Sequence, residues 1–500
     1  MKNKFYITTS IAYTNAEPHI GYAMELIQAD VLARYHRLKG EETWFLTGTD
    51  EHGIKIARAA AAANKDTKAF VDELAAKFEA LPAALNVAND DFIRTSDQTR
   101  HWPTAIKLWE VLQAKGDLYK KNYEGLYCVG HEAFIKKSEL VDGLCPIHKT
   151  KPEVVAEENW FFKLSKYTGE IKKRIENDEL KILPVTRKKE ILNLLDDAED
   201  VSVSRPSKQL SWGIPVPNDP SQTMYVWVDA LSNYISALGW DHDGGDFKKF
   251  WPADVHLIGK DILRFHAIIW PAILLSAEIE LPKAIYVHGF VTANGEKMSK
   301  SIGNVVDPVA MVEKYGTDVV RYFLLREIPS DEDGDFSEEK LIARYNGDLA
   351  NGLGNLVQRV VTLISNNLDG EILFDSNDIR EEDKKFLDLR DYFDLDKIDN
   401  YINNFQLHKV LEYIWFNLAF IDYYINEKQP WAEVKNNKEE FKKTMLMLVR
   451  MIYRISSLLW PFMPETADKI SEIFDFKKES AGLEGRRLKV RKSGVLFPRL

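Results

Sequence analysis

The stretch Ala12-Tyr13-Thr14-Asn15-Ala16-Glu17-Pro18-His19-Ile20-Gly21-Tyr22 lies between a predicted strand and a predicted helix. Before it, residues 4–11 alternate polar and apolar side chains and are rich in β-branched residues, which predicts a buried strand. After it, apolar residues recur at helical spacing up to a glycine: Met24, Ile27, Val31, Tyr35, Leu38 and Gly40. A second strand is expected over residues 43–47. This order predicts a right-handed βαβ unit with a parallel sheet.

Two residues follow the ends of these strands. Parallel sheets bind ligands at the carboxyl ends of their strands, so His19 and Asp50 are candidate site residues. His19 stands where a helix start favours anions, and Gly21 allows a flat group such as a purine to approach the backbone. An ordinary helix start would also explain a lone histidine. The sequence has neither of the common glycine-rich nucleotide-binding loops.

A further candidate is the loop Lys297-Met298-Ser299-Lys300-Ser301, which has glycines on both sides. Glycines permit backbone angles that other residues avoid, which favours a mobile segment. Two ammonium groups on such a loop suit a polyphosphate whose charge shifts during a reaction. Taken alone, the loop is also compatible with a solvated basic turn.

The composition sets outer limits on the function. A chain of 500 residues with 45% hydrophobic and 29% charged residues is typical of a soluble protein of two to four domains. It has no basic and apolar leader and no apolar run of about 20 residues, so we expect a cytoplasmic protein. The net charge of −11 argues against non-specific nucleic-acid binding but allows local basic patches. A run near the end is either such a patch or a solvated tail: Arg486, Arg487, Lys489, Arg491 and Lys492.

The two cysteines occur in a repeated pattern with histidine. Cys128 and Cys145 are each followed three residues later by a histidine, His131 and His148. Two thiolates and two imidazoles form the tetrahedral set that structural zinc prefers, and no position is left for a catalytic water. The pattern predicts one structural zinc ion, against the alternative of plain thiols beside unrelated histidines.

Together, His19-Ile20-Gly21-Tyr22 and the loop 297–301 resemble the paired signatures of class I aminoacyl-tRNA synthetases. Further motifs resemble the methionyl-tRNA synthetase family, in its order and over nearly the whole chain: residues 50–53, 225–230, 258–262, 265–266 and 287–290. The resemblance implies that the chain joins methionine to ATP as an adenylate and then transfers methionine to tRNA. It also implies Mg²⁺ with the ATP.

The resemblance further implies a set of site residues. The ATP-binding residues would be His19, Gly21, Tyr22, Asp261, Lys297 and Lys300, and His19, Tyr22, Lys297 and Lys300 would be catalytic. The methionine site would comprise Ile11 (backbone), Asp50, Trp227, Tyr234 and His266. A carboxylate suits the ammonium group, and aromatic rings with a polar hydrogen suit a thioether. Outside this motif, core packing would explain Trp227 and Tyr234.

Tyr22 is a departure from the family pattern, because the signature usually ends in a second histidine. A phenol can donate a hydrogen bond but carries no positive charge near neutral pH. Its contact and its effect on the reaction rate are therefore open at this point.

The predicted fold class is α/β: a Rossmann-like parallel-sheet catalytic domain with an inserted zinc-bearing connective segment, followed by an all-α helical-bundle anticodon-binding domain. The predicted boundaries are 1–115 and 225–290 for the two catalytic halves, 116–224 for the insertion, 291–345 for the signature loop and linking segment, and 346–500 for the bundle. The insertion is too short for the editing domain of leucyl, isoleucyl and valyl enzymes.

Two bundle helices are predicted from apolar residues at alternating steps of four and three. Their positions are Leu407, Leu411, Ile414, Leu418, Ile421 and Ile425, then Phe441, Met445, Leu448, Ile452, Ile455 and Leu459. By resemblance, Asn355, Arg359 and Trp431 read the anticodon, although plain surface residues or a bundle anchor would give the same pattern. The chain ends soon after the bundle, so we expect a monomer.

Two rival functions follow from the same features. A cysteinyl synthetase would need a cysteine near the first signature, and none precedes Cys128. A non-catalytic tRNA-binding or regulatory protein derived from a synthetase is disfavoured by His19, Lys297 and Lys300, while Tyr22 leaves it open.

Overall fold

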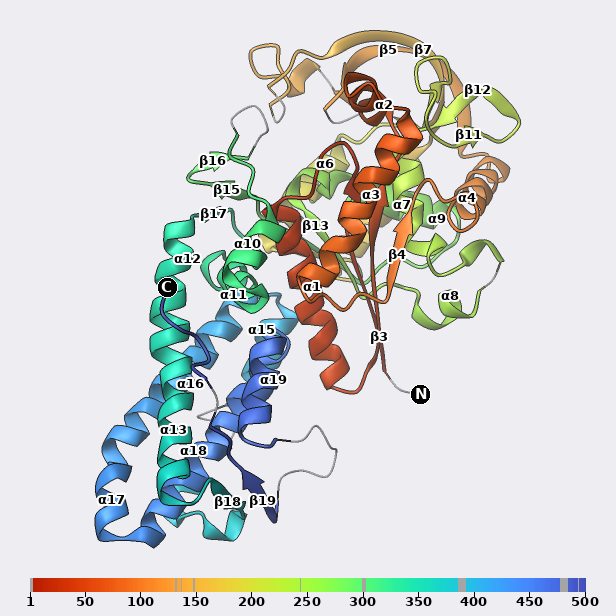
Figure 1. Cartoon of the computed structure of the whole chain (residues 1–500). Helices are drawn as coiled ribbons and strands as arrows, with labels where there is room; N and C mark the ends of the chain where they lie inside the picture. The colour runs from red at the N-terminus through yellow and green to blue at the C-terminus, as the bar shows by residue number, and fades with distance from the viewer. Residues whose placement is uncertain are drawn as a thin grey trace. The chain divides into compact units, whose positions relative to one another are not determined.

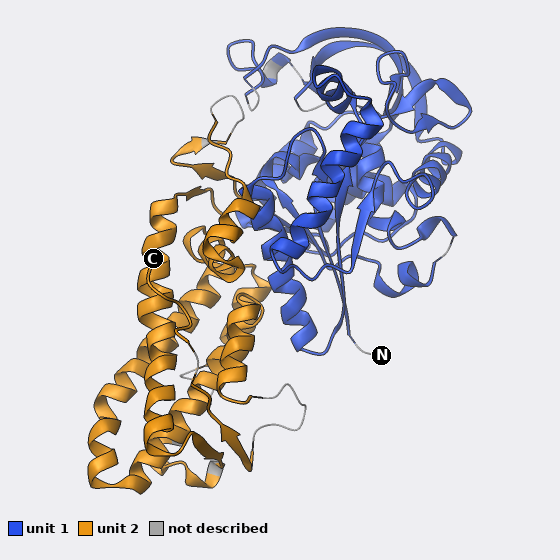
Figure 2. Cartoon of the chain, viewed as in Figure 1, with its two compact units in different colours: residues 1–288 blue, residues 289–500 orange. Residues whose placement is uncertain are grey.

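The computed structural model describes residues 3–130, 133–135, 137–146, 149–242, 244–298, 303–384, 393–476, 484–492 and 494–500 (Figure 1). The chain divides into two compact units, residues 1–288 and residues 289–500 (Figure 2). In the described part of the chain, no helix has both the length and the apolar character needed to span a bilayer.

The first unit is built on a seven-stranded sheet in which every pairing is parallel. The strand order is β2-β3-β1-β13-β14-β8, with β4 beside β3. The strands are β1 (Lys4–Thr9), β2 (Ala12–Tyr13), β3 (Glu42–Asp50), β4 (Asp91–Arg94), β8 (Lys181–Leu183), β13 (Val255–Gly259) and β14 (Ala284–His288). The predicted parallel sheet is confirmed, and helix α1 (Ile20–Leu38) connects the neighbouring strands β1 and β3.

Helices cover both faces of this sheet. A large apolar cluster lies on one face, and helices α4 (Trp102–Ala114), α5 (Thr168–Glu176), α6 (Val185–Asp196), α7 (Val226–Ser236) and α9 (Trp270–Ser276) contribute to it. Helices α1 and α3 (Thr67–Ala84) contact the strands but contribute nothing to that cluster, so they cover the opposite face (Figure 1). The unit also contains helices α2 (Ile54–Ala62) and α8 (Gly245–Phe250). With both faces covered, the central strands are buried, as expected for a parallel sheet.

The first strand is shorter than predicted. It ends at Thr9, because the Ser10 amide donates both to the Leu257 carbonyl oxygen, at 3.0 Å, and to the Glu25 carboxylate, at 2.6 Å. The predicted turn then contains the short strand β2, which pairs with the end of β3. Strand β3 runs through Gly48 to Asp50, beyond the predicted end at residue 47.

The region 116–224 forms two antiparallel sheets. One contains β5 (Leu118–Cys128), β6 (Ala133–Ile135), β7 (Glu153–Phe162) and β9 (Val201–Ser202), and the other contains β10 (Ser204–Pro206), β11 (Pro215–Val216) and β12 (Asp219–Met224). From within this region, β8 pairs with β14 at the edge of the main sheet. The sequence did not predict this strand.

The second unit is mainly helical. Its helices are α10 (Pro308–Tyr315), α11 (Thr317–Glu327), α12 (Glu338–Arg344), α13 (Asn355–Asn367), α14 (Glu381–Lys384), α15 (Leu395–Asn403), α16 (Leu407–Lys428), α17 (Pro430–Asn436), α18 (Lys438–Leu459) and α19 (Pro464–Ile473), with a π-helix at Tyr345–Gly354. The unit also contains a small sheet of β15 (Val291–Ala293) and β16 (Glu296–Lys297), which precede the helices, and β17 (Gly334–Phe336), which lies between α11 and α12. All twelve apolar positions that predicted α16 and α18 are buried, so both helix predictions are confirmed.

The prediction of an all-α bundle is wrong in one respect. Strand β18 (Glu371–Phe374) pairs antiparallel with β19 (Arg486–Lys489), which contains much of the basic run near the C-terminus. Arg487 lies 3.5 Å from the Glu371 carboxylate, and Leu488 is fully buried. The run is thus part of the folded unit and not a solvated tail, because alternate residues of a strand face inward.

Candidate active site

His19 forms the N-cap of α1. Its backbone is extended, and its Nδ1 atom accepts a hydrogen bond of 3.0 Å from the Gly21 amide. Since Nδ1 is an acceptor, the neutral ring carries its proton on Nε2, which can donate to a ligand. Desolvation by surrounding protein lowers the pKa of His19, and the nearby Asp261 carboxylate partly opposes this, although the ring is exposed to solvent. An exposed ring with a lowered pKa is expected at the wall of a concave site.

Tyr22 lies one turn into α1 and points to the sheet. Its hydroxyl lies 2.9 Å from Thr47 Oγ1 and donates weakly to the Gly48 carbonyl oxygen at 3.5 Å. Thr9 Oγ1 donates to Thr47 at 2.7 Å, so the phenol extends a chain of hydroxyls from β1 to β3. Burial raises the pKa of Tyr22, which keeps the phenol neutral. Tyr22 therefore connects the helix start to the ends of two strands.

Asp50 is the last residue of β3 and is 6% exposed. Its carbonyl oxygen accepts from the Thr14 amide at 3.0 Å, which fixes the turn that contains Ile11 against the strand end. Gly48, two residues earlier, admits no side chain, because a Cβ atom would lie 2.1 Å from the Ile93 carbonyl oxygen on β4. The tight β3–β4 pairing thus determines where the Asp50 carboxylate stands.

The predicted aromatic residues come together on α7 and the following π-helix, Phe265–Ile269. The Trp227 ring stacks on Phe265, with centroids 3.8 Å apart and planes 6° apart, and meets His266 edge to face at 6.3 Å. Tyr234 is 1% exposed, and its hydroxyl lies 2.7 Å from His266 Nε2. The predicted grouping of Trp227, Tyr234 and His266 agrees with this geometry.

The hydrogen bonds of His266 define its protonation. Nδ1 lies 3.0 Å from the Ile262 carbonyl oxygen, an acceptor, so this nitrogen carries the proton. Nε2 therefore accepts from the Tyr234 hydroxyl. Burial lowers the pKa of His266 to about 4, so the ring is neutral at physiological pH. Tyr234 is held in a single orientation by this neutral acceptor.

The first signature and the aromatic residues share one electrostatic environment. Burial raises the pKa of Tyr234, and the charges of Glu25 and Asp50 raise it further. Charges act over such a range only when groups are close in a low-dielectric interior. The first unit therefore brings the helix start, the Asp50 carboxylate and the aromatic residues into one region at the carboxyl ends of the strands.

The structure describes the other residues predicted to bind ATP less completely. Asp261 is exposed on the short turn after β13, on the same side as His19, whose pKa it affects. The backbone of Lys297 pairs with Thr292 in the small sheet of the second unit. The Lys297 side chain and the whole of Lys300 lie outside the part of the chain that the structure describes.

A carboxylate that sequence reasoning missed is Glu25, on the buried face of α1. It is 4% exposed, and one oxygen accepts from both the amide and the hydroxyl of Ser10, each at 2.6 Å. The other lies 2.9 Å from His288 Nε2, at the end of β14. Glu25 thus joins the ends of β1 and β14 beside Ile11. In the sequence, Glu25 stands out only as a charged residue among the apolar positions of a predicted helix.

A second missed group is a buried carboxylate between two imidazoles. Asp229 lies 2.6 Å from His52 Nδ1 and 2.7 Å from His101 Nε2, and all three residues are at most 2% exposed. Burial alone would raise the pKa of Asp229, but His52 and His101 outweigh it and the pKa is lowered. His52 and Asp229 fall within recognised motifs, whereas nothing in the sequence marked His101. The group fixes α7 against the end of β3 and the start of α4.

The predicted metal ligands are described only in part. Cys128 and Cys145 are reduced thiols, at most 1% exposed, and share a small apolar cluster with Ile135. His131 and His148 lie outside the described residues. Among the described residues, no three metal-binding side chains come together. The zinc prediction therefore stays a prediction, although two buried thiols in one small cluster fit half of the expected ligand set.

The predicted anticodon residues all lie in the second unit. Asn355 is exposed at the start of α13, and Arg359 bonds to Asp422 at 3.0 Å and to Asn426 at 3.4 Å, both on α16. Trp431 is 47% exposed on α17, which follows α16 directly and contacts α13. A tryptophan with half its surface in solvent is not a bundle anchor.

Comparison with known proteins assigns the chain to a family. The model described as tRNA synthetases class I (M) matches residues 5–151 and 135–361. A methionine–tRNA ligase of Mycobacterium bovis is 43% identical over 479 residues, which cover 94% of this chain and 91% of that protein. The chain belongs to the methionine–tRNA ligase family.

Further members support the same assignment. The methionine–tRNA ligase of Thermotoga maritima is 42% identical, over 95% of this chain and 76% of that protein. The structure of Mycobacterium tuberculosis methionyl-tRNA synthetase in complex with methionyl-adenylate matches with a TM-score of 0.94 and 40% identity, covering 100% of both chains. A model described as the anticodon-binding domain of tRNA ligase matches residues 394–487. The family predicted from the sequence motifs is confirmed.

Proposed function

We propose that the chain is an ATP-dependent methionine–tRNA ligase. Methionine would react with ATP to give methionyl-adenylate and pyrophosphate, and tRNA would then take the methionyl group. The observation that carries this proposal is the gathering of His19, Asp50 and the Trp227–Tyr234–His266 group at the ends of one parallel sheet, in a chain of this family.

The methionine site combines one charge with an aromatic enclosure. The Asp50 carboxylate and the Ile11 carbonyl would bind the ammonium group, since a buried carboxylate is favoured beside a cation. The thioether would pack against Trp227, because sulfur makes favourable contacts with aromatic rings. Tyr234 and the neutral His266 would limit the pocket without adding charge.

The first step is a displacement at phosphorus. A carboxylate oxygen of methionine attacks the α-phosphorus in line, the bond from phosphorus to the bridging oxygen breaks, and pyrophosphate leaves. His19 Nε2–H would donate a hydrogen bond to a phosphate oxygen, Gly21 would allow the nucleotide to approach the backbone, and Asp261 would contribute to ATP binding. Lys297 and Lys300 would contact the phosphates as negative charge develops, and Mg²⁺ would offset charge on pyrophosphate.

The second step transfers the acyl group. A hydroxyl of the terminal ribose of tRNA attacks the methionyl carbonyl carbon, and AMP leaves with the anhydride oxygen. In the second unit, Asn355, Arg359 and Trp431 would bind anticodon bases by hydrogen bonding and stacking.

We also propose a structural zinc ion held by Cys128, His131, Cys145 and His148. The support is the repeated sequence pattern together with the two buried thiols. The Lys149 amide donates to the Cys145 carbonyl oxygen at 2.8 Å, so these two described residues lie close together. The ion would supply cross-linking of the insertion and no catalytic water.

Exchange of labelled pyrophosphate into ATP, measured with each amino acid in turn, tests the activity. Exchange with methionine alone, followed by charging of methionine tRNA, is the expected result. Exchange with another amino acid would contradict the proposed substrate. Binding of tRNA without any exchange would favour the non-catalytic, synthetase-derived alternative.

A further inference from the structure

A buried group beside the proposed methionine site, Asp229 with His52 and His101, takes no part in the proposed reaction steps. Asp229, whose pKa is lowered despite its burial, is an ionised carboxylate and can only accept hydrogen bonds. His52 Nδ1 and His101 Nε2 therefore both carry protons, which they donate to its two oxygens. Because removing one partner of a buried charge is strongly destabilising, the group holds the elements that carry its members at fixed separations.

His52 joins this group to the residue proposed for the ammonium group. Asp50 ends β3, and His52 follows it two residues later. The His52 amide donates weakly to Asp50 Oδ1 at 3.5 Å, while the His52 ring bonds to Asp229 at 2.6 Å. The imidazole also meets the Trp102 and Trp212 rings edge to face, at 6.0 Å and 5.6 Å between centroids. The segment that carries the Asp50 carboxylate is thus attached to α7 through the His52 side chain.

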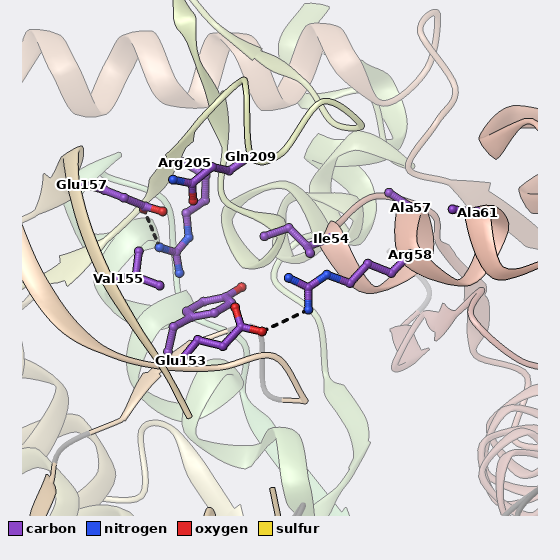
Figure 3. Close-up of a pocket in the computed structure, with 10 residues that line it drawn as sticks. Ile54, Ala57, Arg58, Ala61, Glu153, Val155, Glu157, Arg205 and Gln209 are labelled. Carbon is purple, nitrogen blue, oxygen red and sulfur yellow. Dashed lines mark hydrogen bonds and ion pairs between the residues drawn. The ribbon is translucent and has the colours of Figure 1, made fainter. Parts of the chain in front are cut away.

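The helix that follows His52, α2, has a cavity between it and the insertion. From its start at Ile54, α2 lines one side of this cavity of about 450 Å³, and the insertion lines the other (Figure 3). Arg58 of α2 pairs with Glu153 of the insertion at 3.3 Å, and both side chains are more than half exposed. Exposed pairs add little stability. The position of the segment between β3 and α2 therefore depends largely on bonds of its own residues, and the His52–Asp229 bond connects it to α7.

Helix α7 carries both the carboxylate of this group and the aromatic residues of the site. Trp227 lies two residues before Asp229, and Tyr234 lies five residues after it. His101 Nδ1 lies 2.9 Å from Ser236 Oγ, so the same imidazole contacts α7 at two positions about two turns apart. This double contact opposes sliding and rotation of α7. The placement of Trp227 and Tyr234 is therefore set by the same group that holds the Asp50 segment.

We propose that Asp229 is a positioning residue that sets the distance between the ammonium end and the thioether end of the methionine site, and so selects the length of the substrate side chain. Asp229 acts through His52 on the Asp50 segment and through α7 on Trp227. A site with two fixed ends fits one chain length, and one methylene more or less changes kcat/KM by about 10–200-fold. The inference rests on the proposed function and adds to it a source of specificity that acts through other residues.

The test loosens the connection between the two ends and measures selection by chain length. Asp229→Asn keeps the size of the side chain but replaces one acceptor oxygen with an amide nitrogen that cannot accept from an imidazole. Pyrophosphate exchange is measured with methionine and with S-methylcysteine and homomethionine, whose sulfur lies one methylene nearer to and farther from the ammonium group. The ratio of kcat/KM for methionine to that for each analogue should fall about ten-fold, while the KM for ATP stays within about two-fold.

These ratios separate positioning from general stability, because a loss of folded protein lowers the rates with all three amino acids equally. Asp117→Asn is the matched control. Asp117 is 1% exposed and accepts hydrogen bonds from three side chains with no proposed role in the site: Lys166, Tyr167 and Ser276. This control should lower the melting temperature but leave both ratios unchanged. Unchanged ratios in Asp229→Asn, or an equal fall in Asp117→Asn, would overturn the proposal.

A second pair of variants tests the bond to His52 and keeps Asp229 paired with His101. His52→Ala removes the link to the Asp50 segment, so both ratios should fall about ten-fold. His52→Asn should restore most of the selectivity, because its amide nitrogen can donate in place of Nδ1. Equal ratios in the two variants would contradict the role of this bond. An unmodified chain without methionine-dependent exchange would instead refute the proposed function, so the two failures are distinguishable.

Discussion

At the scale of single residues, Tyr22 differs most from the family pattern, and its contacts define its role. Its hydroxyl bonds to Thr47 and Gly48 at the end of β3, and its ring meets Phe78 of α3 edge to face at 5.4 Å. With the hydroxyl used by the protein, Tyr22 is better suited to position the strand end than to bind phosphate. A tyrosine in place of the usual histidine thus removes a side chain that can carry positive charge, while its hydroxyl bonds to the end of β3.

Replacing Tyr22 separates these two roles. Tyr22→Phe removes one hydrogen bond, which contributes about 0.5–1.5 kcal/mol to stability, so the denaturant midpoint should fall slightly. The KM for ATP should change less than two-fold, and the exchange rate should fall less than about ten-fold. A loss of about 10²–10³-fold in rate, the usual cost of a transition-state donor, would show that the phenol binds phosphate.

His266 predicts a pH dependence of stability. Its pKa is lowered from the usual value of about 6.5 to about 4 by burial, so the unfolded chain binds this proton first as the pH falls. The associated stability is fully present above pH 6.5 and is lost as the pH falls toward 4. Between pH 7 and pH 4.5 the loss of stability from this group is about 2 kcal/mol.

Urea unfolding at both pH values measures this difference. His266→Gln keeps an acceptor for Tyr234 and a donor for Ile262 but cannot titrate, so the stability of this variant should fall by about 2 kcal/mol less over the same interval. Identical losses in the two proteins would mean that the pKa of His266 is the same in the folded and unfolded chains, and a smaller loss in the unmodified chain would mean that the ring is charged when folded.

Sequence reasoning at this scale depended on motifs. His19, Asp50, Trp227, Tyr234 and His266 were identified because they stand in recognisable runs, and the structure gathers them. Glu25 and His101 were missed, because a single charged residue in a helix, or one histidine before it, has the same sequence signature as a surface residue. Only the fold reveals that Glu25 faces the ends of β1 and β14.

At the scale of elements, the signature loop, residues 297–301, is expected to affect the rate of adenylate formation more than the affinity for ATP. If Lys300 contacts phosphate mainly in the transition state, Lys300→Ala should lower the rate of adenylate formation about 10²–10³-fold while ATP binding weakens much less. Single-turnover kinetics and equilibrium ATP binding measure the two quantities. Lys314→Ala, which removes an exposed lysine of α10 paired with Glu338, is the matched control. Equal losses of rate and affinity would contradict the transition-state role.

The insertion gives a second prediction at this scale. If zinc cross-links Cys128 and Cys145, a purified chain should contain one zinc ion by elemental analysis, and Cys145→Ser should contain much less. Removing the metal should lower the melting temperature, because the cluster around the two thiols is small and gains little from apolar burial. A full-length chain with no zinc and an unchanged melting temperature after chelation would disprove the site.

Helices were predicted correctly where the spacing of apolar residues extends over several turns. The 22-residue helices α16 and α18 followed from apolar spacing, and α1 followed from the same signal. Strands of two or three residues, such as β2 and β8, have too few side chains for any periodicity, and tertiary pairing alone creates them. The strand β19 was obscured by its charges, which face outward while Leu488 faces inward.

At the scale of the whole molecule, the proposed methionine-binding residues lie in the first unit and the proposed anticodon residues lie in the second. Trp431→Ala removes a half-exposed ring from the second unit, so kcat/KM for tRNA should fall about ten-fold or more, as expected for one lost base stack. Pyrophosphate exchange depends on the first unit and the signature loop and should not change. Phe416→Ala, which removes a 58% exposed ring from α16, serves as the control. Equal effects of the two variants would argue against a specific anticodon contact at Trp431.

The register of the main sheet has a consequence for synthesis of the chain. Ile7 of β1 pairs with Val255 of β13, about 250 residues later, and β13 then receives β14 and β8. At about 5–20 residues per second, a ribosome needs about 12–50 s between making these two strands. During that interval one edge of β1 has no neighbour, and exposed strand edges promote aggregation. Nascent chains of this protein should therefore depend on chaperones until β13 has emerged.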